Sequence, residues 1–215
     1  MRKTLFMLAA VALAVVGGGA ARAQTDTISD QDKTFLKGQQ ETNIAEVALG
    51  KVAVERATTE TVRELAKKLL ADHQQVMELN RALSTKLGLP VPEQPSAEQQ
   101  ATGEKVKAQT GAAFDAAYVA AQVEGHTKSI SKAQQEISSG SHPEVKAFAT
   151  DYAPKAQMHL QHAQAAQAEL ASETARDASP DLARTGTASG PLIFFGLGLV
   201  SIGLVARRWG RWQQP

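Results

Sequence analysis

The sequence predicts an all-α protein, and three features of its middle part support this. From about residue 30 to residue 171, the chain is rich in Ala, Gln, Glu, Lys and Leu, most of them strong helix formers. Stretches that alternate apolar and polar residues, as a half-buried strand does, are nearly absent. Apolar residues recur instead every three or four positions, the spacing that places them on one side of a helix. The pattern is typical of long amphipathic helices packed together.

Two helices are predicted in the first half of this region. The first extends from about Asp30 to Ala57, and the second begins near Thr59 and ends before the stop signal Gly88-Leu89-Pro90. The second helix has the more regular apolar stripe, formed by Val62, Leu65, Ala66, Leu69, Val76, Met77, Leu83 and Leu87. Only a few residues join the two helices, so we expect an antiparallel hairpin.

A second hairpin is predicted in the other half. Its first helix extends from about Gly111 to Ser138, and its second opens at Pro143, because proline is favoured at the first helical position. The apolar stripe of this last helix continues to Leu170. Pro154 lies inside the stripe and predicts a kink about one turn earlier.

The connection between the hairpins is much longer than the turns within them. It covers residues 88 to 110, contains three prolines and includes a short helix predicted from about Ala97. A short, a long and a short connection are typical of the ferritin-like four-helix bundle rather than the simple up-and-down bundle. We therefore predict a ferritin-like bundle over residues 30–171.

Both ends of the chain predict export and anchoring. Residues 1–23 combine Arg2-Lys3, an apolar stretch and Ala21-Arg22-Ala23, as in a secretory signal peptide. Residues 172–190 resemble a flexible stalk, and the apolar residues 191–206 predict a transmembrane segment near the short limit for a membrane about 30 Å thick. Residues 207–215 form a basic tail, which favours a cytoplasmic carboxyl terminus. The bundle would then lie on the extracytoplasmic face of the membrane.

Before the apolar segment, Leu182-Ala183-Arg184-Thr185-Gly186 resembles the Leu-Ala-x-Thr-Gly variant of sortase sorting signals. This resemblance implies cleavage after Thr185 and attachment to the cell wall, with sortase as a partner. The alternative is a tail-anchored protein in which these residues are a flexible linker. The predicted location is accordingly the membrane surface or cell wall, or the periplasm in a cell with an outer membrane.

Composition excludes several functions. The chain has 23 basic and 22 acidic residues and a net charge of +1, so it lacks the basic surface that nucleic acids require. It has no cysteine, which excludes disulfides, thiolate metal sites and a cysteine nucleophile. Nucleotide-binding and hydrolase motifs are absent from the sequence. These observations favour a non-enzymatic role and do not identify a protein partner.

Each long helix offers one ionisable residue to the interior. His73 lies near the centre of the second helix's apolar stripe, His126 and His159 occupy comparable positions on the third and fourth helices, and Glu46 lies at the edge of the first helix's stripe. Their distances from the hairpin turns, at about 1.5 Å per residue, place all four near one level. We therefore predict a cluster of Glu46, His73, His126 and His159, with His162 at its flank.

This cluster has two main interpretations. Three imidazoles and a carboxylate would suit zinc, copper or iron. Alternatively, Glu46 accepts hydrogen bonds from the imidazoles in a buried network without metal. A ferritin-type di-iron site is not expected, because Leu70 and Ala156 stand where its Glu-x-x-His motifs need glutamate. His142, in the last turn, is expected to be exposed.

Several segments between Asp32 and Leu170 resemble an exported ferritin-like bundle family catalogued as domain of unknown function 4142. The segments are Phe35-Leu36, Ile44 to Lys51, Ala71-Asp72-His73, Phe114 to Tyr118, Gly125-His126, Pro143 to Ala149 and His159. The resemblance implies the fold, export and an envelope location, and it brings no established activity. We therefore predict an anchored, non-enzymatic envelope protein with a structural, stress-related or interaction role; the alternative is an extracytoplasmic metal-binding protein, with or without redox activity.

Overall fold

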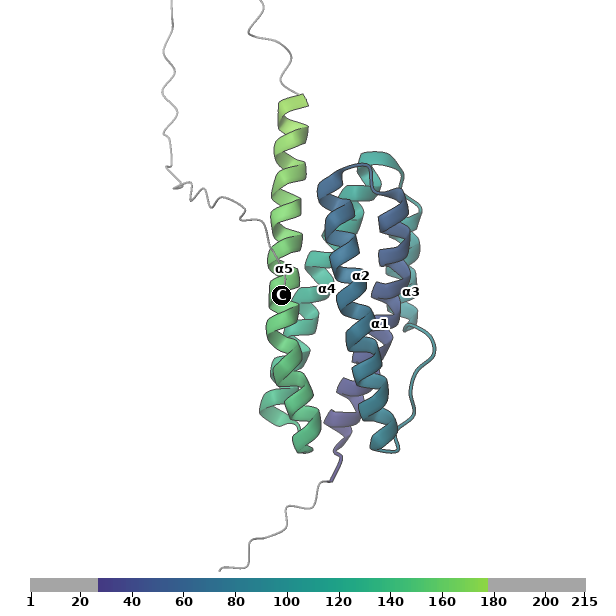
Figure 1. The fold of residues 1–215 in the computed structure, drawn as a ribbon, viewed down its shortest axis with the longest axis vertical. Coiled ribbons are helices and arrows are strands. Elements are labelled where there is room, and N and C mark those ends of the chain that lie inside the picture. Colours follow the sequence, from purple (N-terminus) through teal and green to yellow (C-terminus); the bar gives the residue numbers. More distant parts are fainter. Residues whose placement is uncertain (1–26, 178–215) are drawn as a thin grey trace, which may run out of the picture. The chain divides into compact units, whose positions relative to one another are not determined.

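The computed structural model describes residues 27–177, which form five α-helices and, within that range, no β-strand (Figure 1). The helices are α1 (Asp30–Arg56), α2 (Glu60–Lys86), α3 (Ala97–Lys107), α4 (Gly111–Ser139) and α5 (Pro143–Asp177). No helix in this described part is long and apolar enough to span a bilayer. The predicted signal peptide, sorting motif, transmembrane segment and basic tail lie outside the described residues.

The all-helical prediction is confirmed, and the predicted helix boundaries lie close to the observed ones. The short helix predicted in the long connection is α3. The clearest difference is at the carboxyl end of α5, which continues past residue 171 to Asp177. Thr174 Oγ1 donates to the carbonyl oxygen of Leu170 at 2.9 Å, and Arg176 Nε donates to that of Ser172 at 3.2 Å. These bonds reach back one turn and occupy carbonyl groups near the end of the helix.

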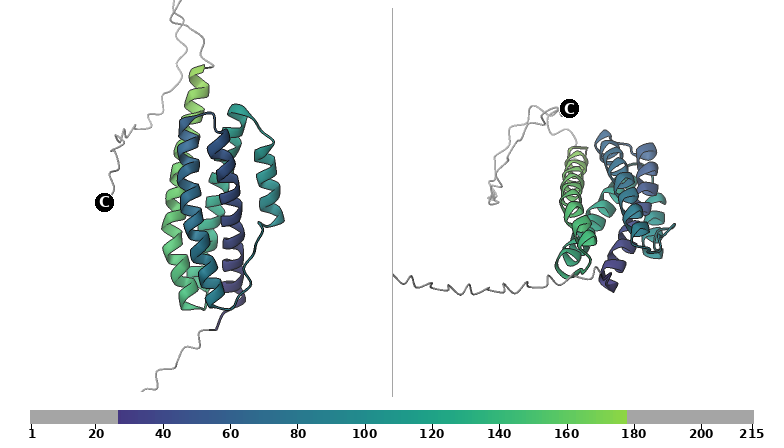
Figure 2. Two further views of the ribbon diagram at one scale, coloured as in Figure 1. Left: turned by 45° about the vertical axis from the view of Figure 1, so that its right-hand side comes forward. Right: turned by 60° about the horizontal axis from the view of Figure 1, so that its bottom comes forward.

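The helices form two antiparallel hairpins, α1 with α2 and α4 with α5, joined by the connection that contains α3 (Figure 1). Figure 2 shows α3 on the outside of the four long helices. It packs against α1 and α4 and contributes a single buried residue, Val106. The four long helices therefore supply nearly all of the core.

Each hairpin turn is held by an aspartate from the other hairpin. Asp115 of α4 is fully buried and accepts hydrogen bonds from the backbone and hydroxyl groups of Thr58 and Thr59, at 2.8 to 3.1 Å. At the opposite end of the bundle, Asp32 of α1 accepts from the backbone N–H groups of Ser141 and His142, at 3.0 to 3.3 Å. The two turns are thus fixed reciprocally.

His142 differs from the sequence expectation. The sequence predicts an exposed turn residue, whereas only 4% of His142 is exposed in the structure. The physical reason is the hydrogen bond from its backbone N–H to Asp32, which draws the turn against the start of α1. Nδ1 of its ring is buried and has no hydrogen-bond partner.

The core consists of two apolar clusters with a polar layer between them. The first cluster, near the α1–α2 turn, includes Leu49, Ala53, Val62, Leu65, Ala66, Leu69, Phe114, Tyr118, Val119, Ala163 and Ala166. The second, near the α4–α5 turn, consists of Phe35, Leu36, Val76, Ala133, Val145, Ala149, Tyr152 and Ala156. The intervening turns of the helices carry the buried residues Gln39, Gln40, Asn43, His73, Gln122, His126, Ser129 and His159. This polar layer contains the predicted histidines.

Near the α4–α5 turn, two buried carboxyl groups have opposite pKa shifts. Burial acts to raise the pKa of Asp32, but hydrogen bonds with Ser29, Glu136 and His142 outweigh it and lower the pKa to about 2. Burial, together with the nearby Asp32, raises the pKa of Glu136 to about 7, although Gln31 donates a hydrogen bond to its Oε2. Glu136 is therefore protonated in the folded protein at mildly acid pH.

This arrangement predicts that Glu136 makes the protein less stable as the pH rises. Unfolded glutamate ionises near pH 4.3, whereas folded Glu136 keeps its proton to about pH 7, so this contribution to the free energy of unfolding falls between these values. Glu136→Gln cannot ionise and should remove that fall. Urea unfolding at pH 5 and pH 8 measures the difference. The exposed Glu78→Gln is the control, and an equal change of stability between the two pH values in the wild type and in Glu136→Gln would contradict the prediction.

Candidate metal centre

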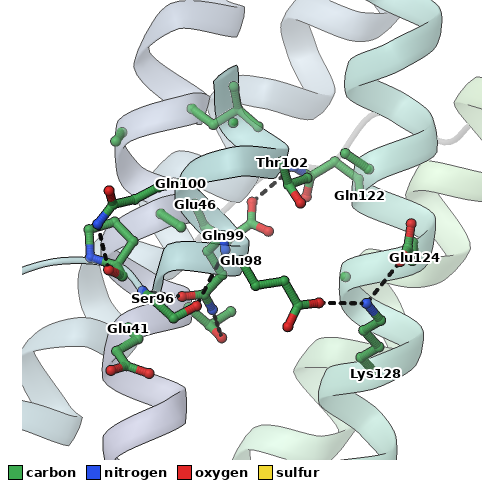
Figure 3. Close-up of a pocket in the computed structure, with 18 of the residues that line it drawn as sticks. Glu41, Glu46, Ser96, Glu98, Gln99, Gln100, Thr102, Gln122, Glu124 and Lys128 are labelled. Carbon is green, nitrogen blue, oxygen red and sulfur yellow. Dashed lines mark hydrogen bonds and ion pairs between the residues drawn. The ribbon is translucent and has the colours of Figure 1, made fainter. Parts of the chain in front are cut away.

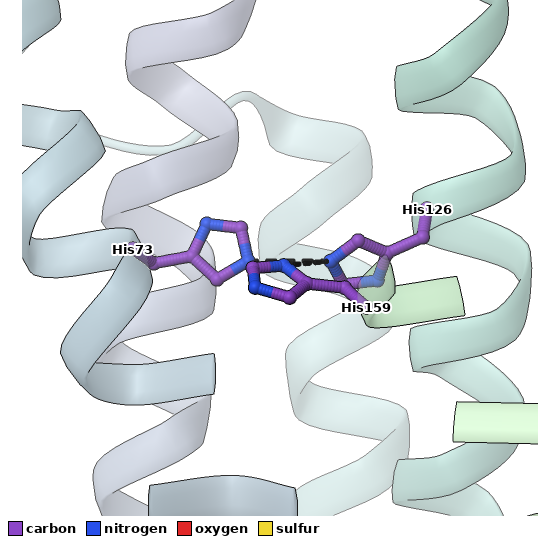
Figure 4. A group of neighbouring side chains, drawn as sticks. All are labelled: His73, His126 and His159. Carbon is purple, nitrogen blue, oxygen red and sulfur yellow. Dashed lines mark hydrogen bonds between the residues drawn. The ribbon is translucent and has the colours of Figure 1, made fainter. Parts of the chain in front are cut away.

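Three imidazoles meet in the polar layer, one each from α2, α4 and α5 (Figure 4). His73 and His126 are 1% exposed, and His159 is fully buried. One ring nitrogen of each lies within 4.8 Å of the others. Nε2 of His126 is 3.3 Å from Nε2 of His73 and 3.2 Å from Nδ1 of His159. The prediction that these histidines converge is therefore correct.

The other nitrogen of each ring, called the outer nitrogen, faces away from the other two rings and lies beside a hydrogen-bond acceptor. Nδ1 of His73 is 3.0 Å from Oδ1 of Asn43 on α1. Nδ1 of His126 is 2.8 Å from the backbone oxygen of Gln122, and Nε2 of His159 is 2.8 Å from Oδ2 of Asp72 on α2. Amide and carboxylate oxygens only accept, so the outer nitrogen of each ring must donate.

The outer hydrogen bonds determine whether each inner nitrogen carries a proton or a lone pair. A neutral imidazole has one N–H, so each ring that donates outward has a lone pair on its inner nitrogen. When all three rings are neutral, three lone pairs face one another without a proton between them. A metal ion at the centre would accept all three. Ligand nitrogens about 2.0 Å from a tetrahedral ion are separated by roughly 3.3 Å, close to the two short nitrogen separations in this centre.

The environments of His73 and His159 favour the neutral form. Burial, with the nearby His126 and His159, holds the pKa of His73 well below its usual value. Burial lowers the pKa of His159 to about 4, even though its hydrogen bond to Asp72 acts to raise it. Neutral imidazole is the form that binds metals, so protons compete little for these two rings at neutral pH.

Asp72 connects the histidine group to the protein surface. Its carboxylate accepts from His159 and also pairs with Nζ of Lys68 at 3.3 Å, and its side chain is 22% exposed. A carboxylate behind a ligand histidine fixes the ring's orientation and increases its basicity. Asp72 directly precedes His73 in the sequence, and this position does not predict its contact with His159. Consecutive helical residues point in different directions, so Asp72 serves the histidine of the neighbouring helix.

Glu46 and His162, the other predicted members, are not part of the histidine group. Oε2 of Glu46 accepts a hydrogen bond from Nε2 of Gln122 at 2.9 Å, and burial raises the pKa of Glu46. The place beside His73 belongs to Asn43, one turn earlier on α1. His162 lies about one turn beyond His159, is half-buried, and has a pKa lowered by that burial.

The lowered histidine pKa values predict acid sensitivity of the metal-free protein. Between about pH 6.5 and pH 4, histidine in the unfolded chain binds protons that folded His73 and His159 do not bind. The free energy of unfolding therefore decreases as the pH is lowered, by at most about 1.4 kcal/mol per pH unit for each residue. Glu136 opposes this trend, so the measurement uses Glu136→Gln. Its urea midpoint should be lower at pH 5 than at pH 7.

The same comparison in Glu136→Gln/His159→Gln is the control, and its pH dependence should be weaker. A Glu136→Gln protein that becomes more stable on acidification would contradict the prediction. That result would instead indicate an imidazolium held by a carboxylate, since such a pair raises the histidine pKa and is lost as the pH rises.

Comparisons with known proteins agree with the fold. A sequence model for the family described as "Domain of unknown function (DUF4142)" matches residues 18–166. The solved structure "Crystal structure of DUF305 fragment from Deinococcus radiodurans" aligns with a TM-score of 0.59 and 15% identity, over 66% of this chain and 98% of that chain. At this identity, the similarity concerns the fold alone. No curated protein matches the chain.

Proposed function

Because the chain belongs to the DUF4142 family, whose description states no activity, we propose from its histidine group that the bundle binds one transition-metal ion. One observation carries the proposal: acceptors on three sides orient His73, His126 and His159 so that their lone pairs converge. A network that only satisfied buried polar groups would be expected to place a donor opposite each inner acceptor. Here the geometry leaves a place for a cation.

The ligand set favours zinc or copper over iron. Imidazole nitrogen suits both zinc and copper, and three protein ligands leave a fourth position for water or another small ligand. Non-haem iron is commonly held by two histidines and a carboxylate, and Glu46 and Asp72 lie outside the inner group. A cavity lies between α1, α3 and α4, and none of the three histidines lines it. Storage or transport of the ion therefore fits the site better than catalysis on a substrate.

We also propose that the protein works in the cell envelope. The signal-peptide pattern of residues 1–23 and the apolar residues 191–206 support export and anchoring, and residues 182–186 support attachment by a sortase. The two-hairpin connectivity supports the ferritin-like assignment. An exported bundle would acquire its metal outside the cytoplasm and hold it as a non-enzymatic envelope protein.

The first experiment measures metal stoichiometry. Metal-free protein at pH 7.5 should bind one equivalent of Zn²⁺, Cu²⁺ or Co²⁺, and Co²⁺ should give the visible absorption of a low-coordinate nitrogen site. A metal ion present at one hundred times its Kd should raise the free energy of unfolding by about 2.7 kcal/mol. His73→Ala should lose stoichiometric binding.

His162→Ala, on the same helix as His159 but outside the group, is the matched control and should bind normally. Wild-type protein that is folded by circular dichroism and binds none of these ions at micromolar concentration would refute the proposal. A stability loss in His73→Ala without metal binding in the wild type would favour the metal-free network.

A second experiment tests the carboxylate behind His159. Asp72→Asn preserves the shape of the side chain and removes its charge, so metal affinity should fall about 10-fold to 100-fold at unchanged stoichiometry. Competition with a chromogenic chelator measures this. Glu64→Asn alters an exposed carboxylate on the same helix and should leave affinity unchanged, whereas equal affinities for Asp72→Asn and wild type would show that Asp72 does not support the site.

A further inference from the structure

A cavity of about 330 Å³ lies between α1, α3 and α4 (Figure 3). Its size is within the range of pockets that hold small molecules. The α1 side contributes the apolar side chains of Ala45, Leu49 and Val52, and the polar residues Glu46 and Gln122 come from α1 and α4. The cavity is separate from the inner side of the histidine group, since none of the three histidines lines it.

Two acceptor oxygens, on residues that line this cavity, have no hydrogen-bond donor among the described residues. Gln122 is 1% exposed, and its Nε2 donates to Oε2 of Glu46. Its own Oε1 is buried without a hydrogen-bond partner. Among the described residues, Oε1 of Glu46 also receives no hydrogen bond. The bond holds the carboxylate of Glu46 beside the amide of Gln122, and a buried acceptor such as Oε1 of Gln122 is normally satisfied in folded proteins.

The lysines that line the cavity do not neutralise Glu46. Lys128 pairs with Glu98 at 3.1 Å and with Glu124 at 2.8 Å, as Figure 3 shows. Lys107 pairs with Glu104. Lys132 lies almost three turns from Gln122 along α4, roughly 15 Å away along the axis. The lysines of the walls are therefore paired with glutamates or distant, and the half-buried carboxylate of Glu46 forms no ion pair among the described residues.

The wall formed by α3 is held mainly by polar contacts. Val106 is its only buried residue. Nε2 of Gln99 donates to Oγ1 of Thr42 at 2.7 Å, and Glu98 reaches Lys128. An exposed ion pair such as Glu98 with Lys128 contributes little stability. A ligand can therefore enter by a small displacement of α3 without disturbing the four long helices.

We propose that this cavity binds a small organic ammonium ion with a short apolar body. The ammonium group has three N–H donors and a positive charge, which match the carboxylate of Glu46, beside which Gln122 lies. The apolar body fits against Ala45, Leu49 and Val52. A metal ion fits less well, because among the described residues Glu46 belongs to no group of three carboxylates or histidines that could hold one. The proposal does not depend on metal binding by the histidines.

The test uses n-butylammonium as the probe and n-butanol as its uncharged analogue of similar size. In ¹H–¹⁵N spectra, butylammonium should shift the side-chain amide signals of Gln122 and the backbone signal of Gly125 in a saturable manner at millimolar concentration. Butanol should bind at least tenfold more weakly. Glu46→Gln should weaken butylammonium binding at least tenfold. Glu41→Gln, a carboxylate at the same cavity on the same helix, should change it less than twofold.

Equal binding of butanol and butylammonium, unchanged binding by Glu46→Gln, or no saturable shift would each overturn the proposal. Cobalt binding distinguishes this result from failure of the metal centre. Glu46→Gln should still bind one Co²⁺ if the histidine centre is real, and His73→Ala should still bind butylammonium. Shifts of Gln122 caused by Co²⁺ and lost in Glu46→Gln would show that the cavity takes a metal ion instead.

Discussion

The structure depends on burying a polar layer in the middle of a bundle that is apolar above and below it. An imidazole that enters this layer must find an acceptor for its N–H, and each of the three does so at 2.8 to 3.0 Å. Two of these acceptors, Asn43 and Asp72, belong to a different helix from the ring they orient. The longitudinal register of the four long helices is therefore fixed by hydrogen bonds as well as by packing, and the same bonds aim three lone pairs at one point.

Much of this could be predicted because helical periodicity is a strong signal. The apolar stripes gave the four long helices, and His73, His126 and His159 each stand in a stripe, so their convergence followed from 3.6 residues per turn. Periodicity is a weaker guide at the edge of a stripe. Glu46 and Asn43 lie one turn apart on α1, and the packing of α1 against α2 decides which of them meets His73.

Other features could not be predicted, because they depend on contacts between helices. Asp72 reaches His159 only through the packing of α2 against α5, and nothing local to either helix indicates that pair. His142 resembled an ordinary turn residue, yet a carboxylate more than a hundred positions earlier in the chain buries it. The hydrogen bond between Gln122 and Glu46 at the α3 cavity depends similarly on the packing of α4 against α1.

The reciprocal aspartates at the two turns have a consequence for how the chain folds. Asp115 satisfies the amides of the first turn and Asp32 those of the second, so each half of the protein carries the group that completes the other half. A hairpin by itself would expose the amides of its turn to water, and one of its own aspartates would lose the donors that it has in the full bundle. Neither half is then a natural folding unit, and the bundle should assemble in one cooperative transition despite its apparent division into two similar parts.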